Sequence, residues 1–149
     1  MEPLLVICPQ AEENPRLAAV LSHALEGRSH VKVQRPDQLH PVTGQRVLFA
    51  ISLLHGGVNL GWYAMLSAIR QNSHFFDGCR GAVLVDGDGE LYTKSAAREL
   101  VFAANQAGCA FMGVKNRYPP TGLETEDIPL PDGLFARLTE TQDILRAII

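Results

Sequence analysis

The sequence predicts an α/β fold, in which a five-stranded parallel sheet of order 2-1-3-4-5 carries helices on both faces. Short, almost continuously apolar runs alternate along the chain with amphipathic helical patterns, which is typical of a parallel sheet covered on both sides. Five strands joined by right-handed crossovers fit this order, with the reversal between the first and third strands.

Length and composition limit the possible functions. The 149 residues predict a single domain, long enough to bury a core without disulfides. The net charge of −3 and the lack of basic runs argue against nucleic-acid or membrane partners. Cys8, Cys79 and Cys109 have no zinc-site spacing and are expected to be buried thiols of a cytoplasmic protein. The apolar run at residues 4–8 is too short for a signal peptide or a membrane span.

The N-terminal part is expected to form two strands around one helix. Residues 3–8 (PLLVIC) predict the first strand, and residues 31–33 a short strand at the sheet edge. Asn14 is expected to cap the helix, Pro15 to begin it and Gly27 to end it. The residues expected to form its buried stripe are Leu17, Val20, Leu21, Ala24 and Leu25. Residues 35–45 predict a loop with one helical turn near 37–40, a short connection for a parallel crossover.

The remaining elements continue the alternation. Residues 46–52, 81–86 and 109–114 predict the third, fourth and fifth strands. Asn59 is expected to cap a helix that buries Trp62, Met65, Leu66 and Ile69, leaving Tyr63 as a contact for a ligand or partner. Thr93 or Ser95 is expected to open another helix, closed by Gly108, that buries Ala96, Leu100, Ala103, Ala104 and Ala107. A polar connection over 115–131 leads to a last helix from Asp132 to the end.

Three predicted strands end where a ligand is expected to bind. They end at Cys8, Ser52 and Asp86 and run into loops at residues 9–13, 53–58 and 87–92. In an open α/β sheet, ligands bind outside the carboxyl ends of the strands, next to the point where the strand order reverses. We therefore expect the binding site at these three loops.

The sequences of these loops suggest a family. The first runs from Cys8-Pro9-Gln10 to a helix that begins Asn14-Pro15-Arg16-Leu17. The second is Leu54-His55-Gly56-Gly57, and the third is Asp86-Gly87-Asp88-Gly89-Glu90-Leu91-Tyr92. In the position of these loops, over residues 3–114, the chain resembles the three-layer flavodoxin-like fold and, within it, the NADPH-dependent FMN reductases. In that family the first loop binds the flavin phosphate and the other two flank the flavin ring.

The resemblance implies an FMN-binding oxidoreductase that takes electrons from NAD(P)H and forms homodimers or tetramers. It requires no metal and no particular acid–base residue, because the flavin carries the redox chemistry. The residues it implies for cofactor binding are Gln10, Asn14, Arg16, Leu54, His55, Gly56, Gly57, Asn59, Gly87, Asp88, Gly89 and Tyr92.

One departure from the family pattern leaves a second hypothesis open. Residues 9–17 contain no Ser or Thr, whose hydroxyls commonly bind phosphate, and they include Glu12 and Glu13. The alternative is a non-catalytic flavodoxin-fold binding or assembly module that does not bind FMN. Asn14 would then be only a helix cap and Arg16 a solvated residue, and the glycines at 56 and 57 would only permit a turn.

Other sites with this topology fit the sequence less well. A calcium loop starting at Asp86 needs a glutamate at its twelfth position, where Ala97 stands. A response-regulator receiver needs an aspartate where Ser52 ends the third strand, and a hydrolase of the HGG type needs a G-x-S-x-G turn that this chain lacks. The connection at 115–131 is either a contact for the nicotinamide cofactor or a partner subunit, or a surface excursion.

Overall fold

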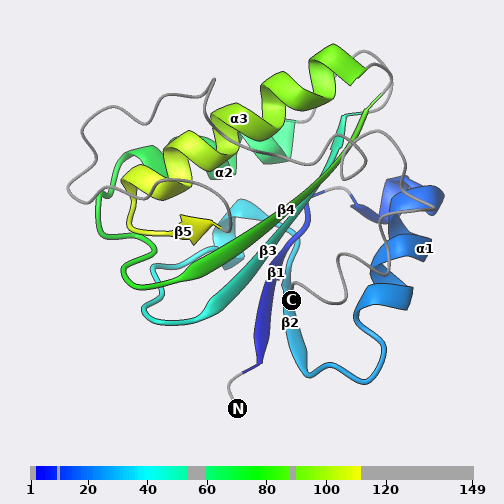
Figure 1. The fold of residues 1–149 in the computed structure, drawn as a ribbon, viewed down its shortest axis with the longest axis horizontal. Coiled ribbons are helices and arrows are strands. Elements are labelled where there is room, and N and C mark those ends of the chain that lie inside the picture. Colours follow the sequence, from blue (N-terminus) through cyan, green and yellow to red (C-terminus); the bar gives the residue numbers. More distant parts are fainter. Residues whose placement is uncertain (1–2, 10, 54–59, 88–89, 112–149) are drawn as a thin grey trace.

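A computed structural model describes residues 3–9, 11–53, 60–87 and 90–111, and these contain a five-stranded parallel sheet of order β2-β1-β3-β4-β5 (Figure 1). The strands are β1 (Leu4–Ile7), β2 (His30–Val33), β3 (Arg46–Leu53), β4 (Arg80–Gly87) and β5 (Ala110–Phe111). The strand order predicted from the sequence is confirmed. The connection at 115–131 and the last predicted helix lie outside the described residues.

Helices cover both faces of the sheet, so the protein has three layers. Helix α1 (Pro15–Ala24) packs on one face, and α2 (Leu60–Arg70) and α3 (Glu90–Gln106) pack on the other (Figure 1). Successive residues in the middle of β3 face two separate cores: Leu48 and Ala50 lie in the core under α1, and Phe49 and Ile51 in the core under α2 and α3. This alternation follows from the two-residue period of a strand.

Helix α1 begins and packs as the sequence predicts. The Asn14 side chain accepts a hydrogen bond from the Leu17 N–H at 3.1 Å, and Pro15 occupies the first turn. The stripe Leu17, Val20, Leu21, Ala24 and Leu25 is buried against β1 and its neighbours. The helix ends at Ala24, and Gly27 adopts a φ of +73° in the turn that follows.

Helix α2 buries the face that its pattern indicates, and the residues predicted to be buried by α3 are buried except Ala96, which is only partly buried. Trp62, Met65, Leu66 and Ile69 are buried, so Trp62 belongs to the core, whereas Tyr63 is 47% exposed. The buried face of α3, continued by Ala107 directly after the helix, consists largely of small side chains, which allow close approach to the sheet: Ala97, Leu100, Val101, Ala103 and Ala104.

The predicted start of α3 is wrong. The helix begins at Glu90, so Thr93 and Ser95 lie inside it and do not cap it. The predicted 87–92 loop is correspondingly shorter, because Gly87 ends β4 and Tyr92 lies in the first turn of α3.

The connection between β2 and β3 crosses the face that α2 also covers. It contains a short 3₁₀ helix, η2 (Pro36–Gln38), whose Gln38 side chain accepts hydrogen bonds from the N–H groups of Gln34 and Arg35. Leu39 then inserts into the core under α2 and α3. The short connection therefore crosses the sheet with a single helical turn and is anchored to the core by one buried leucine. Among the described residues, no helix is both long and apolar enough to cross a membrane.

Candidate functional site

The carboxyl ends of β1, β3 and β4 meet at one edge of the sheet. Chain order reverses between β1 and β3, because β2 lies beyond β1 while β4 and β5 lie beyond β3. Ser52 and Asp86 are directly paired in the register of β3 and β4. The loop after β1 forms a short 3₁₀ helix, η1 (Ala11–Glu13), and places Asn14 at the same edge. The ligand-binding edge expected from the sequence therefore gathers polar residues from three strands or the segments after them.

Asp86 is the charged residue at the centre of this edge. Asp86 is only 2% exposed, and it follows the apolar residues of β4. It is therefore a buried charged residue at the end of a buried strand. The carboxylate accepts hydrogen bonds from Asn14 Nδ2 at 2.8 Å and from Arg16 Nε at 2.9 Å, and its other oxygen accepts one from Arg16 Nη2. Burial of an ionised carboxylate is tolerated when charged and hydrogen-bonding partners compensate for its lost hydration.

Asn14 connects the start of α1 to β3 and β4. Its Oδ1 accepts from the Leu17 N–H, and its Nδ2 donates to both Ser52 Oγ, at 3.1 Å, and Asp86. Asn14 is buried, so these bonds replace the water that its amide would otherwise bind. The helix-cap reading of Asn14 is correct, and the same side chain also fixes where α1 begins relative to the sheet.

The guanidinium group of Arg16 is held by Asp86 through two hydrogen bonds along one side of the group. Two of its nitrogens bond the two carboxylate oxygens, a side-on bidentate pair. The side chain of Arg16 is 57% exposed while that of Asp86 is 3% exposed. The pair thus presents an oriented guanidinium at the surface. We refer to Asn14, Arg16, Ser52 and Asp86 as the Asp86 cluster.

The acidic residues in and near the first loop do not by themselves make this edge of the sheet negatively charged. Within the Asp86 cluster, the arginine and aspartate charges balance, so the buried carboxylate does not leave a net negative charge. Glu13, one of the two acids in the first loop, is exposed to solvent, where water and salt screen its charge.

The structure brings together only some of the predicted site residues. Asn14 and Arg16 meet at the Asp86 cluster, Gly87 follows Asp86 as the end of β4, and Tyr92 lies in α3. Gln10, Leu54, His55, Gly56, Gly57, Asn59, Asp88 and Gly89 lie outside the described residues.

Asp86 and Ser52 are not among the cofactor-binding residues predicted above, although Asp86 begins the third loop motif and Ser52 ends the third predicted strand. A signal was present, because each polar residue directly follows an apolar run predicted to be a buried strand. Their partners come from a segment more than thirty positions away in the chain, and no local pattern indicates such a contact.

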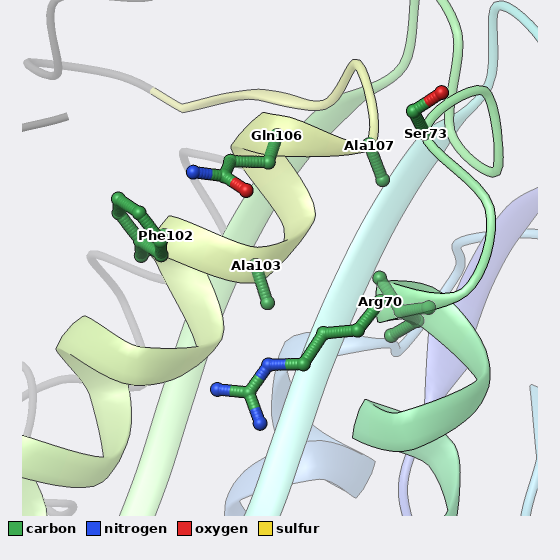
Figure 2. Close-up of a pocket in the computed structure, with 7 residues that line it drawn as sticks. Arg70, Ser73, Phe102, Ala103, Gln106 and Ala107 are labelled. Atoms are coloured by element: carbon green, nitrogen blue, oxygen red, sulfur yellow. The ribbon is translucent and has the colours of Figure 1, made fainter. Parts of the chain in front are cut away.

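A separate groove lies at the opposite edge of the sheet, between the C-terminal ends of α2 and α3 (Figure 2). Its volume is about 340 Å³, and its lining residues are Ile69, Arg70, Ser73, Phe102, Ala103, Gln106 and Ala107. Arg70, the one charged lining residue, donates to Glu99 of α3 at 2.9 Å, and both side chains are about half exposed. The groove therefore lacks the buried charged residue that marks the carboxyl edge.

Comparisons with known proteins do not assign the chain to a family. No protein-family model and no curated protein sequence matches the chain. Within the described ranges, no group of three or more His, Cys, Asp or Glu side chains is placed to hold a metal ion.

Proposed function

We propose that this chain is an FMN-binding flavoprotein of the flavodoxin-like class, an NAD(P)H-dependent oxidoreductase with its cofactor at the carboxyl edge beside the Asp86 cluster. The observation that supports this most directly is the position of that cluster, at the point where the strand order of a 2-1-3-4-5 sheet reverses. In open parallel sheets this point is the usual ligand site.

The residues at the edge fit a phosphorylated cofactor. Arg16 is accessible and oriented by Asp86, and an oriented guanidinium can bind phosphate oxygens through charge-assisted hydrogen bonds. It extends from the first turn of α1, where the helix dipole favours an anion. Asn14 and Ser52 would keep this turn in place against β3 and β4. Bound FMN would supply the redox chemistry, and the protein would hold and orient it.

The assembly and location implied by the resemblance are part of the same proposal. We propose a cytoplasmic homodimer or tetramer. Light scattering coupled to size-exclusion chromatography measures the assembly directly, and a monomeric mass would remove this part of the proposal.

A specific observation favours the second candidate, a flavodoxin-fold module that does not bind FMN. Asn14 uses its amide for three hydrogen bonds within the protein, and Arg16 is paired with Asp86. Two of the residues expected to bind phosphate thus also have an internal structural role. The two candidates differ in whether FMN binds at all.

Titration with FMN separates the two candidates. We expect purified protein to quench FMN fluorescence saturably, with one site per chain, and to bind riboflavin more weakly because riboflavin lacks the phosphate. Arg16→Ala should weaken FMN binding about 10- to 100-fold, as loss of a charged hydrogen-bond partner usually does, with little change for riboflavin. Arg70→Ala is the matched control, since Arg70 is also an ion-paired helix arginine but lies at the opposite edge.

The outcome of the titration decides the function. Saturable binding, followed by FMN-dependent oxidation of NADH or NADPH, supports the oxidoreductase. A colourless preparation that leaves added FMN fluorescence unchanged rejects it in favour of the non-catalytic module.

A further inference from the structure

Cys79 and Cys109 lie side by side on neighbouring parallel chain segments. Cys79 directly precedes β4, and Cys109 directly precedes β5. Arg80 pairs with Ala110, and the Ala110 N–H donates to the Cys79 carbonyl at 2.8 Å. Each cysteine directly precedes one member of this pair, so the same register places Cys79 opposite Cys109. Neighbouring strands lie about 4.8 Å apart, which is within the range of about 4.4–6.8 Å between the Cα atoms of disulfide-bonded cysteines.

The two side chains also lie on the same face. Both belong to the buried core under α2 and α3. A Cβ atom built on Gly81 would lie 2.8 Å from the Cys109 sulfur, so the sulfur occupies space that only glycine leaves open. The Cys79 S–H lies 3.6 Å from the carbonyl oxygen of Val42. Cys8, the third free thiol, lies in the other core, under α1, with the sheet between it and the pair.

From this geometry we infer that Cys79 and Cys109 are a redox-active pair, which closes to an intramolecular disulfide when a disulfide oxidant such as glutathione disulfide is present. The Cys79 thiolate attacks one sulfur of glutathione disulfide, forming a mixed disulfide and releasing one glutathione. Cys109 then attacks the Cys79 sulfur, forming the protein S–S bond and releasing the second glutathione. The two thiols lose two electrons and two protons in total, and glutathione disulfide is reduced to two glutathione thiols.

The surroundings assign the first attack to Cys79. Burial raises the pKa of both thiols, but hydrogen bonds from the backbone of Gln45 and Gly44 partly offset this for Cys79. The pKa of Cys109 is raised further, by burial and then by the neighbouring Cys79. The thiolate is the reactive form, so closure is slow in the folded protein and depends on local opening. We assign this opening to β5, which lies at one side of the described sheet and of which the structure describes Ala110 and Phe111.

Mass spectrometry of the full-length protein tests the pair. The reduced protein is incubated with excess glutathione disulfide at pH 8, quenched with acid and digested with trypsin without reduction. We expect the intact protein to lose two hydrogen atoms, and the tryptic peptides covering residues 71–80 and 99–115 to be joined. Reduction should restore the starting mass. We also expect the oxidised form to melt about 10 °C higher, because a disulfide restricts the unfolded chain.

Two variants control the experiment. Cys109→Ser should stop the reaction at one glutathione attached to Cys79, whereas Cys8→Ser should oxidise as the original chain does. If Cys109→Ser does not fold, the disulfide map of the unmodified protein still decides. A disulfide that includes Cys8, glutathione on both Cys79 and Cys109 without closure, or an unchanged mass after prolonged incubation would each overturn the inference.

Discussion

At the residue scale, Asp86 and Arg16 form an ion pair of unequal exposure. The aspartate is buried, while the arginine side chain remains more than half exposed. The Arg70–Glu99 pair joins two side chains that are both about half exposed. Removing the exposed partner of a buried charge is costly because the charge loses its compensation, whereas exposed pairs contribute little. The two pairs should therefore respond differently to the same substitution.

Arg16→Ala is predicted to lower the free energy of unfolding by about 1–3 kcal/mol, a range reduced from that of fully buried pairs because Arg16 is exposed. Arg70→Ala should lower it by less than about 0.5 kcal/mol. Urea denaturation followed by far-ultraviolet circular dichroism measures both. Equal losses in the two variants would show that Asp86 does not depend on Arg16 for its stability.

At the element scale, the packing of β5 against β4 depends on Gly81. A Cβ on Gly81 would lie 2.5 Å from Phe111 Cε1 and 2.8 Å from the Cys109 sulfur. Both distances are shorter than van der Waals contact. Phe111 also packs near Phe49, with ring centroids 6.1 Å apart, so it has little room to move away. The absent side chain at position 81 thus lets Phe111 of β5 pack into the core.

Gly81→Ala is predicted to destabilise the protein by about 1–3 kcal/mol, the usual cost of overpacking a core. Thermal denaturation monitored by circular dichroism measures the loss. The double variant Gly81→Ala/Phe111→Leu should be less destabilised than the sum of its single variants, because leucine removes ring atoms from the site of overlap. Strictly additive losses would mean that Phe111 is not the side chain that the new methyl group meets.

At the scale of the whole molecule, two thiols in one core couple stability to pH. The pKa values of Cys79 and Cys109 are raised above the ordinary 9.0, chiefly by burial. Above that pH the unfolded chain releases thiol protons that the folded chain retains. The unfolded state then binds fewer protons than the native state, so stability falls as pH rises. The contribution is fully present at neutral pH and is lost on the alkaline side.

Chemical denaturation between pH 7 and pH 10.5 should therefore show alkaline destabilisation that depends on Cys109. Cys109→Ala is expected to be the less stable protein at pH 7, because it leaves a cavity. Above pH 9, its deficit should shrink by up to about 1.4 kcal/mol per pH unit, the value for one proton. A deficit that stays constant with pH would show that this thiol does not titrate differently in the two states.

Local patterns predicted most of the architecture because they report periodicity and burial. The apolar runs at 4–8, 46–52 and 81–86 identified strands covered on both faces, and the Asn14-Pro15 pair identified where α1 begins. The start of α3 was misplaced, because Thr93 and Ser95 resemble capping residues locally and nothing nearby in the sequence shows that the helix has already begun at Glu90.

The sequence by itself determined the order of the elements, their apolar faces and the edge of the sheet at which polar residues accumulate. Only the tertiary structure decided that Asp86 is the centre of that edge and that Asn14 and Arg16 bind it. It also decided that Cys79 and Cys109 are neighbours. Periodicity encodes which face of a strand or helix is buried, whereas contacts between distant residues depend on the register in which the strands pair, and that register is a property of the assembled sheet.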